Sequence, residues 1–283
     1  MIVTRFAPSP TGYLHLGHAF AAITAKRAGE RFLLRIEDID RARCRPEFET
    51  AIYEDLSWLG LDWETPVLRQ SERFDAYRAA LDGLEAQHLL YPCFCTRAEI
   101  AAEIARASEA PHNAILGPEG PVYPGTCRDL TEKERNMRIE SGAPYALRLD
   151  SRKAASVAGT LTFAEQGAGP HGEHGNIAVD PLLFGDIVLA RKETPASYHL
   201  SVVVDDAFQG VTLVTRGNDL FAAAHIQRVL QALLDLPTPV YAHHKLILDE
   251  NGKKFSKRDS TVTLCALRQN GVTPDQVRTQ LFG

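Results

Sequence analysis

Two histidines lie close together near the N-terminus, behind a turn rich in proline and glycine. His15 and His18 follow Pro8, Pro10 and Gly12. Glycine lets the backbone approach a ligand closely, and a helix N-terminus offers N–H groups and a positive dipole end to a phosphate. Two imidazoles can also donate hydrogen bonds to charge that develops on a phosphate. These residues suggest a phosphate site, although a turn with two surface histidines has the same composition.

A second candidate for chemistry is a run of lysines near the C-terminus. The stretch Lys253-Lys254-Phe255-Ser256-Lys257-Arg258 follows Asp249-Glu250-Asn251-Gly252. Lysines in a glycine-containing loop can swing over a triphosphate, because an ammonium group is a compact charge suited to phosphate oxygens. A charge run of this kind is more often a solvated loop, so the composition alone does not decide between the two interpretations.

A third candidate is a group of cysteines. Cys93 and Cys95 have Cys-x-Cys spacing, and Cys127 lies further along the chain. Three thiolates and one more ligand suit tetrahedral zinc, and buried or free thiols are the alternative. The chain has five cysteines in all, which fits a reducing compartment with a metal site better than a disulfide scaffold. We therefore expect a cytoplasmic protein.

Four polar residues form a candidate site for an amino acid. Arg5, Glu37, Tyr198 and Arg216 lie on or beside predicted strand ends, where open parallel sheets bind ligands. The two arginines can form charge-assisted bonds to a carboxylate. Glu37 can accept a hydrogen bond from an ammonium group, and the hydroxyl of Tyr198 can complete the cage. On composition alone, four unrelated surface residues would be the better interpretation.

The N-terminal segment has the pattern of a βαβ unit. Residues 2–6 are predicted to be a buried strand, and residues 7–12 a tight turn because they contain two prolines and a glycine. The alanine-rich stretch 16–28 is predicted to be a helix that ends at Gly29, and residues 31–36 a second strand. This order favours an α/β fold with a parallel sheet.

The rest of the chain is predicted to hold further helices and strands around an insertion. We predict helices over residues 46–59, 71–88 and 219–234, strands at 202–204 and 211–215, and short strands around Tyr241 and Leu246. Residues 91–180 are rich in glycine, proline and cysteine, and we interpret them as an insertion between residues 1–90 and 181–283, the two halves of the sheet domain.

Composition restricts the possible partners only weakly. The 283 residues are 45% hydrophobic and 24% charged, as in ordinary globular proteins. No apolar run approaches the roughly 20 residues of a membrane span, and no secretory signal is evident, so we expect no membrane partner. The net charge of −5 gives no support for a nucleic-acid partner. It does not exclude one, because arginine and lysine can cluster on one face.

Longer strings around these residues resemble a known family. The string from Ala7 to His18, Ala-Pro-Ser-Pro-Thr-Gly-Tyr-Leu-His-Leu-Gly-His, resembles the HIGH signature of class I aminoacyl-tRNA synthetases in the form used by the glutamyl and glutaminyl branch. The lysine run resembles the KMSKS loop of the same class, with Phe255 in place of methionine and Arg258 in place of serine. Segments 5–10, 35–40, 197–200 and 204–220 are similar to matching segments of glutamyl-tRNA synthetases.

This resemblance implies a Rossmann-type catalytic domain that is split by a zinc-bearing insertion, and it assigns roles to residues. His15, His18 and Lys257 would be catalytic, at the α-phosphate of ATP, with Mg²⁺ held chiefly by the phosphates. The ATP site would comprise Pro8, Gly12, His15, Gly17, His18, Lys254, Ser256 and Lys257. The glutamate site would comprise Arg5, Ala7, Ser9, Glu37, Tyr198 and Arg216. Asp205 and Asp206 are predicted to be structural partners in the sheet or of the amino-acid site.

Two further strings are most similar to a family of shorter relatives, the glutamyl-Q tRNA(Asp) synthetases. They are Gln-Gly-Val-Thr at 209–212 and Arg-Gly-Asn-Asp-Leu at 216–220. This resemblance implies that one structural zinc ion is held by Cys93, Cys95, Tyr123 and Cys127. Phenolate is not among the usual zinc ligands, so His112 or a water is the alternative fourth ligand.

The stretch after the lysine run bears on the acceptor. Only 25 residues, 259–283, follow it, which is too short for the helical anticodon-binding domain of a full glutamyl-tRNA synthetase, so we expect none. The shorter family implies L-glutamate, ATP and queuosine-containing tRNA(Asp) as partners, adenylate formation without tRNA, and a monomer. A truncated glutamyl-tRNA synthetase that charges a tRNA 3′ end, and a degenerate paralogue that binds a nucleotide or tRNA, are the alternatives.

Overall fold

The computed structural model describes residues 1–108, 116–191, 194–247 and 263–283. Its N-terminal half is built on three parallel strands in the order β1 (Val3–Phe6), β2 (Arg31–Ile36) and β3 (Glu64–Arg69). Helix α1 (Leu16–Ala28) connects β1 to β2, so the predicted βαβ unit is confirmed.

The close packing of α1 on these strands depends on Gly29, at the end of the helix. A Cβ atom at this position would lie 2.3 Å from Oγ1 of Thr4 on β1. The hydroxyl of Thr4 in turn donates to the carbonyl of Ala25 at 2.8 Å. Only glycine therefore fits where the helix turns back to the sheet.

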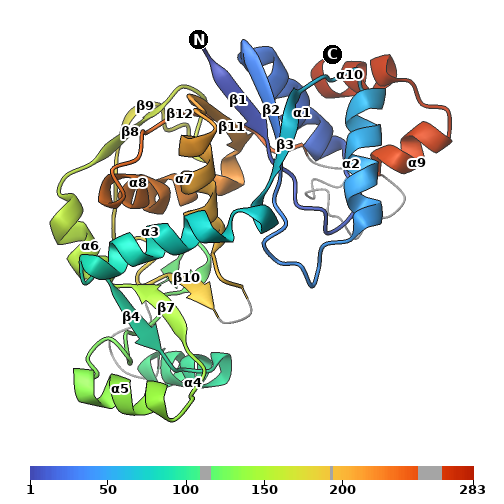
Figure 1. Cartoon of the computed structure of the whole chain (residues 1–283). Helices are drawn as coiled ribbons and strands as arrows, with labels where there is room; N and C mark the ends of the chain where they lie inside the picture. Colours follow the sequence, from blue (N-terminus) through green and yellow to red (C-terminus); the bar gives the residue numbers. More distant parts are fainter. Residues whose placement is uncertain (109–115, 192–193, 248–262) are drawn as a thin grey trace.

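A second set of strands continues the sheet beyond β1. Strand β11 (Leu213–Gly217) pairs in parallel with β12 (Val240–His244), which pairs with β8 (Thr162–Glu165), and β9 (Gly175–Ala178) follows antiparallel to β8. The amide of Thr212 donates to the carbonyl of Val3 at 3.0 Å, which places β11 beside β1. Figure 1 shows the two sets side by side. The carboxyl ends of β1, β2 and β11 therefore lie near one another, at the point where the strand order reverses.

A separate antiparallel sheet lies at the far end of the molecule from the chain termini (Figure 1). It has the order β10 (Val188–Arg191), β7 (Ala146–Leu149) and β4 (Leu90–Cys93). Helices α4 (Arg97–Ser108) and α5 (Glu132–Glu140) and the two-residue strands β5 (Leu116–Gly117) and β6 (Gly120–Pro121) accompany it. The domain division at residue 180 stays a prediction, and β8 and β9 from inside the predicted insertion pair with β12.

The remaining helices cover the two sheets. They are α2 (Pro46–Trp58), α3 (Phe74–Ala86), α6 (Ser151–Ala158), α7 (Tyr198–Phe208), α8 (Ala223–Leu233), α9 (Leu264–Gln269) and α10 (Pro274–Phe282). Short 3-10 turns at Gln70–Glu72 and Asn218–Leu220 precede α3 and α8, so the helices predicted over 71–88 and 219–234 are shorter than expected. Among the described residues, no helix has the length and apolar character that crossing a membrane requires.

The predicted strand at 202–204 is wrong, because these valines lie in α7. Ser197 caps this helix by accepting a hydrogen bond from the amide of Leu200. Val202 and Val203 are buried on the helix, and a short apolar run cannot by itself distinguish a buried helix from a buried strand. The strand expected around Leu246 is also absent, since residues 245–247 have no regular structure, whereas the strand around Tyr241 is confirmed as β12.

The C-terminal helices belong to the N-terminal half of the fold. Leu264 and Val277 are buried in the same apolar cluster as residues of α1, α2 and the first strands. Arg268 of α9 lies 3.4 Å from Asp55 of α2 and 2.7 Å from Glu54. The chain that follows residues 248–262 is therefore held against the N-terminal half (Figure 1).

We predict that Asp55→Asn stabilises the protein at pH 8. The Asp55 side chain is fully buried, and burial raises its pKa to about 6, an effect that the charge of Arg268 only partly offsets. Because the folded pKa lies above the unfolded value, ionisation of Asp55 opposes folding as the pH rises through both values. The stabilisation should be about 1–2 kcal/mol at pH 8 and should shrink toward pH 4 in thermal unfolding.

Asp82→Asn is the matched control, because Asp82 is exposed on α3. It should change the unfolding free energy little at either pH. Equal effects of the two substitutions at pH 8 would show that burial imposes no ionisation cost on Asp55.

Candidate active site

A buried carboxylate joins three elements where the parallel strands end. Asp206 of α7 lies 3.1 Å from Nε of Arg5 on β1 and 2.7 Å from Nη1 of Arg35 on β2. Burial alone would raise the pKa of Asp206, but the charges of Arg5 and Arg35 outweigh it and lower that pKa. Nη2 of Arg35 also lies 3.2 Å from Glu37. Two cations and two carboxylates therefore balance one another in this cluster.

A cleft of about 320 Å³ opens beside this cluster and contains several predicted glutamate-site residues. Ser9, Glu37 and Tyr198 line it. Burial raises the pKa of Tyr198, and the charges that act on it most come from Arg216, Glu37 and Arg5. Ser9, Glu37 and Tyr198 thus meet at the cleft. Arg5 of β1 and Arg216 of β11 are not among its lining residues, but they lie near enough for their charges to act on Tyr198.

Arg216 differs from the other arginines of the site because its partners are neutral or aromatic. It is only 6% exposed, Nε donates to Nε2 of His243 at 3.0 Å, and Nη1 donates to Oε1 of Gln227 at 2.8 Å. Its guanidinium lies over the ring of Tyr241, 5.1 Å from the centroid. Nη2 has no hydrogen-bond partner among the described residues. A buried cation with an unused donor is suited to an anionic ligand.

Asp205, the neighbour of Asp206, bonds to different residues. It accepts from the hydroxyl of Tyr77 at 2.7 Å, from Gln70 at 3.0 Å and from Arg73 at 2.9 Å. These contacts join α7 to α3 and to the turn before it. Asp205 is therefore a structural partner of the helices, whereas Asp206 is a partner of the site.

The two histidines of the first motif form the N-terminal cap of α1. Nδ1 of His15 accepts from the amide of Gly17 at 3.1 Å, and Nδ1 of His18 accepts from the amide of His15 at 3.2 Å. A neutral imidazole that accepts at Nδ1 carries its proton on Nε2. A Cβ atom on residue 17 would lie 3.1 Å from Cε1 of His15, so glycine permits this arrangement.

The predicted ATP turn is hydrogen-bonded through its backbone to the segment that carries Glu37 into the cleft. The carbonyl of Pro8 accepts from the amide of Glu37 at 3.0 Å, so the segments after β1 and β2 are directly bonded. Pro8 and Gly12 are buried. Ala7 is half-buried and is not among the residues that line the cleft.

The first described residue after the second motif, Thr263, lies beside the first motif. Lys254, Ser256 and Lys257 lie outside the described residues. Thr263, however, forms an isolated antiparallel bridge with His15, and the amide of Leu264 donates to the carbonyl of Leu14 at 2.8 Å. The chain that follows the lysine run is thus anchored beside the histidine motif.

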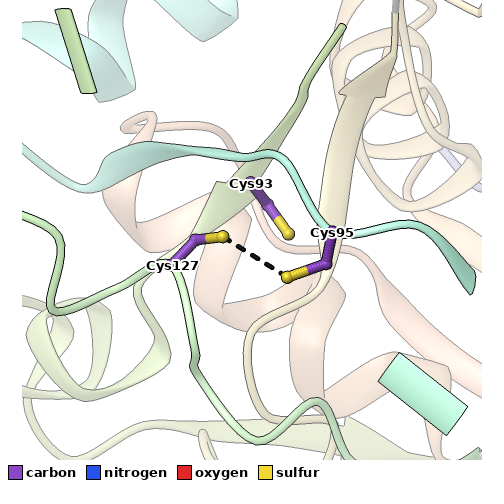
Figure 2. A group of neighbouring side chains, drawn as sticks. All are labelled: Cys93, Cys95 and Cys127. Atoms are coloured by element: carbon purple, nitrogen blue, oxygen red, sulfur yellow. Dashed lines mark hydrogen bonds between the residues drawn. The ribbon is translucent and has the colours of Figure 1, made fainter. Parts of the chain in front are cut away.

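The three cysteines form one compact cluster near the end of β4. Their sulfur atoms all lie within 4.8 Å of one another, and Figure 2 shows the side chains of Cys93, Cys95 and Cys127 pointing toward a common centre. The sulfurs of Cys95 and Cys127 are 3.4 Å apart. With zinc–sulfur bonds of about 2.3 Å, tetrahedral geometry needs sulfurs about 3.8 Å apart, so small shifts would admit the ion.

Tyr123 lies against this cluster. Its hydroxyl is 3.4 Å from the sulfur of Cys93 and 3.5 Å from that of Cys95, and it accepts from the amide of Cys127 at 2.9 Å. Arg148 lies over the Tyr123 ring, 3.8 Å from its centroid. All the ligands that the family resemblance implies are therefore together. His112, the alternative ligand, lies outside the described residues.

Sequence reasoning did not identify Arg35, Gln227 and His243 as part of the site. The sequence does contain a signal for Arg35: it stands two residues before Glu37, and alternate residues of a strand share a face. His243 is the register partner of Arg216 across β11 and β12. No local pattern specifies that register, so a role for His243 could not be predicted from the sequence.

The chain matches known proteins over nearly all of its length. Residues 1–282 match the family described as tRNA synthetases class I (E and Q), catalytic domain. The chain is 51% identical to the Glutamyl-Q tRNA(Asp) synthetase of Rhodobacter capsulatus, covering 98% of both chains. It is 43% identical to the protein of that name from Symbiobacterium thermophilum, covering 98% of this chain and 84% of the relative.

Longer synthetases share the same domain. The chain is 39% identical to the Glutamate–tRNA ligase of Aquifex aeolicus, covering 97% of this chain and 55% of the relative. The crystal structure of glutamate-tRNA synthetase from Elizabethkingia anophelis matches with a TM-score of 0.74 and 29% identity, covering 92% of this chain and 53% of that one. The chain thus spans about half the length of these proteins. It belongs to the class I tRNA synthetases of the glutamyl and glutaminyl type, and it is a synthetase-like ligase similar throughout to glutamyl-Q tRNA(Asp) synthetases.

Proposed function

We propose that the protein activates L-glutamate with ATP in the absence of tRNA and transfers the glutamate to the queuosine base at the wobble position of tRNA(Asp). The observation that carries the amino-acid part is the buried Arg216, whose Nη2 has no partner among the described residues. The acceptor part is supported by the names of the relatives at 51% and 43% identity. Because the substrate is a tRNA, we place the enzyme in the cytoplasm, where it would act as a monomer.

The charges around the cleft favour a glutamate ligand. Arg5 and Arg35 are balanced by Asp206 and Glu37 within the buried cluster. No carboxylate among the described residues lies within ion-pair distance of Arg216, so that cation is left for a carboxylate of the ligand. The carboxylate of Glu37, in the cleft with Ser9, would accept from the α-ammonium group. Ala7, which does not line the cleft, would contribute only its backbone.

The first step is attack of the α-carboxylate oxygen of glutamate on the α-phosphorus of ATP. A carbon–oxygen–phosphorus anhydride bond forms, and pyrophosphate leaves with the electrons of the broken bond. His15 and His18 would donate from Nε2 to the phosphate oxygens as negative charge develops, because Nδ1 of each ring accepts a backbone amide. Lys257 would add a positive charge, and the remaining acceleration would come from positioning. Mg²⁺ would arrive with the phosphates of ATP.

The second step is attack of a hydroxyl of the queuosine cyclopentenediol on the carbonyl carbon of the adenylate. An ester forms, AMP leaves, and the hydroxyl proton passes to solvent or to the leaving phosphate. Transfer to the 3′ end of a tRNA is the alternative, which the 39% identity to a Glutamate–tRNA ligase keeps open. The higher identity to the shorter relatives favours the base as the acceptor.

We also propose that Cys93, Cys95, Cys127 and Tyr123 hold one structural zinc ion. The donor set fits, because thiolates are preferred zinc ligands and the Tyr123 hydroxyl already contacts two of the sulfurs. The cluster lies at the end of the molecule that holds α4 and α5, away from the parallel strands (Figure 1). Zinc would therefore stabilise this end of the protein and take no part in activation.

The activation step is tested by ATP–pyrophosphate exchange with glutamate and no tRNA. We predict exchange by the unmodified enzyme and a loss of about 100-fold or more in Lys257→Ala and in His18→Ala, because each removes a donor to the transition state. Lys133→Ala is the control, since Lys133 is exposed on α5, and it should exchange normally. Exchange that needs added tRNA would contradict tRNA-independent activation.

The metal site is tested by the zinc content of the purified protein. We predict about one zinc per chain, with loss of zinc and a lower melting temperature in Cys127→Ser, because structural zinc contributes directly to folding. Cys265→Ser should retain the metal, since Cys265 lies on α9 and is not part of the cysteine cluster. Tyr123→Phe should bind zinc more weakly, because it lacks the proposed phenolate ligand. An unmodified protein without zinc, or equal loss in Cys265→Ser, would overturn the assignment.

A further inference from the structure

Behind Arg216 lies a buried hydrogen bond between Glu165 and His243 that the proposed reaction does not use. His243 stands on β12, in register with Arg216 on β11. Its Nδ1 is 2.5 Å from Oε2 of Glu165, the last residue of β8, and neither side chain is exposed. Its Nε2 is 3.0 Å from Nε of Arg216. A continuous hydrogen-bonded chain therefore runs from β8 through β12 to β11.

The position of Glu165 in this chain is fixed by the backbone. Its Oε1 accepts from the amide of His243 at 2.9 Å and from that of Gly167 at 2.8 Å. A Cβ atom on residue 167 would lie 2.1 Å from the carbonyl oxygen of His243, so only glycine allows this segment to pack against β12. Burial, the largest effect, raises the pKa of Glu165, but the hydrogen bonds and charge of His243 together with the amide of Gly167 outweigh it and lower that pKa. Glu165 is therefore an ionised acceptor.

An ionised carboxylate sets the tautomer of His243. Because Glu165 can only accept, Nδ1 of His243 must carry the proton and donate it. Burial and the neighbouring Arg216 lower the pKa of His243 in spite of Glu165, so the ring is neutral. Nε2 then has a lone pair, and it accepts the Nε proton of Arg216. The opposite tautomer would place two N–H groups face to face.

This chain determines the orientation of the Arg216 guanidinium. One edge is held at Nε by His243, and Nη1 is held by Gln227 at 2.8 Å. The ring of Tyr241 stacks on that of His243, with centroids 5.9 Å apart, and also lies beneath the guanidinium. A planar group held at two nitrogens has no freedom left, so the direction of the remaining Nη2 donors is fixed.

We infer that His243 is a positioning residue, which Glu165 holds in the tautomer that orients Arg216 toward a carboxylate of the amino-acid substrate. The inference rests on the proposed role of Arg216 in glutamate binding. Its benefit is lower conformational freedom of the arginine before the substrate arrives, which strengthens binding without any new contact. Glu165 and His243 should affect binding of the amino acid but not of ATP, since neither residue touches the histidine motif in the described structure.

Two polar substitutions of His243 separate its two hydrogen bonds. In His243→Gln, Oε1 can occupy the place of Nε2 and accept from Arg216. In His243→Asn, the side-chain amide can occupy the place of Nδ1 and donate to Glu165, but the shorter side chain leaves no acceptor for Nε of Arg216. We expect KM for glutamate in ATP–pyrophosphate exchange to rise about 10-fold or more in His243→Asn and to stay within about 3-fold in His243→Gln, because one charge-assisted hydrogen bond is lost only in the former. KM for ATP should not change in either variant.

Two further variants make the outcomes distinguishable. Arg216→Gln should raise KM for glutamate at least as much as His243→Asn, and an unchanged KM in Arg216→Gln would count against the proposed function itself. His225→Gln is the control for a buried histidine, because His225 on α8 accepts from the amide of Asp180 and makes no bond to Arg216. It should leave KM for glutamate unchanged. A normal KM in His243→Asn, or equal defects in the asparagine and glutamine variants, would overturn the positioning role alone.

Discussion

The arrangement of the site depends on one buried carboxylate, that of Asp206 between Arg5 and Arg35. Charges removed from water are tolerated only when they are paired and hydrogen-bonded, so this cluster forces β1, β2 and α7 into a fixed relation. Tyr198, the first residue of α7, lines the cleft, so the helix that carries Asp206 also contributes to the cleft. The proposed glutamate site is thus built around the contacts that join β1, β2 and α7.

Arg216 completes the site because its environment has the opposite character. The arginines of the first strands have acidic partners, whereas Arg216 has an imidazole, an amide and an aromatic ring. Because these partners are neutral, the charge of Arg216 is not balanced in the empty site, which costs free energy. A bound carboxylate would offset that cost. The predicted ATP turn is joined to this pocket by the backbone bond from Glu37 to Pro8, and Thr263 pairs with His15 at the far side of that turn. The proposed amino-acid and ATP sites therefore lie along one edge of the sheet.

The sequence predicts the parts of this account that depend on local patterns. The βαβ unit follows from an apolar strand, a proline–glycine turn and an alanine-rich helix, and three cysteines suggest a metal cluster from residue type alone. The valines of α7 misled the prediction, because a short β-branched run fits a buried helix as well as a strand. The partners of Asp206 and of Arg216 could not be predicted, since they arise from the register of strands that are distant in the chain. Lys257 was assigned by resemblance, and it lies outside the described residues.

The most direct test of the central claim follows labelled glutamate to its acceptor. The purified enzyme is given ATP, labelled glutamate and, separately, queuosine-containing tRNA(Asp), the same tRNA without queuosine, and tRNA(Glu). Our account predicts label on the first tRNA alone, in the anticodon-loop fragment after nuclease digestion. Label at the 3′ end of tRNA(Glu) would contradict it and identify a minimal charging enzyme, and no label on any tRNA would contradict transfer altogether.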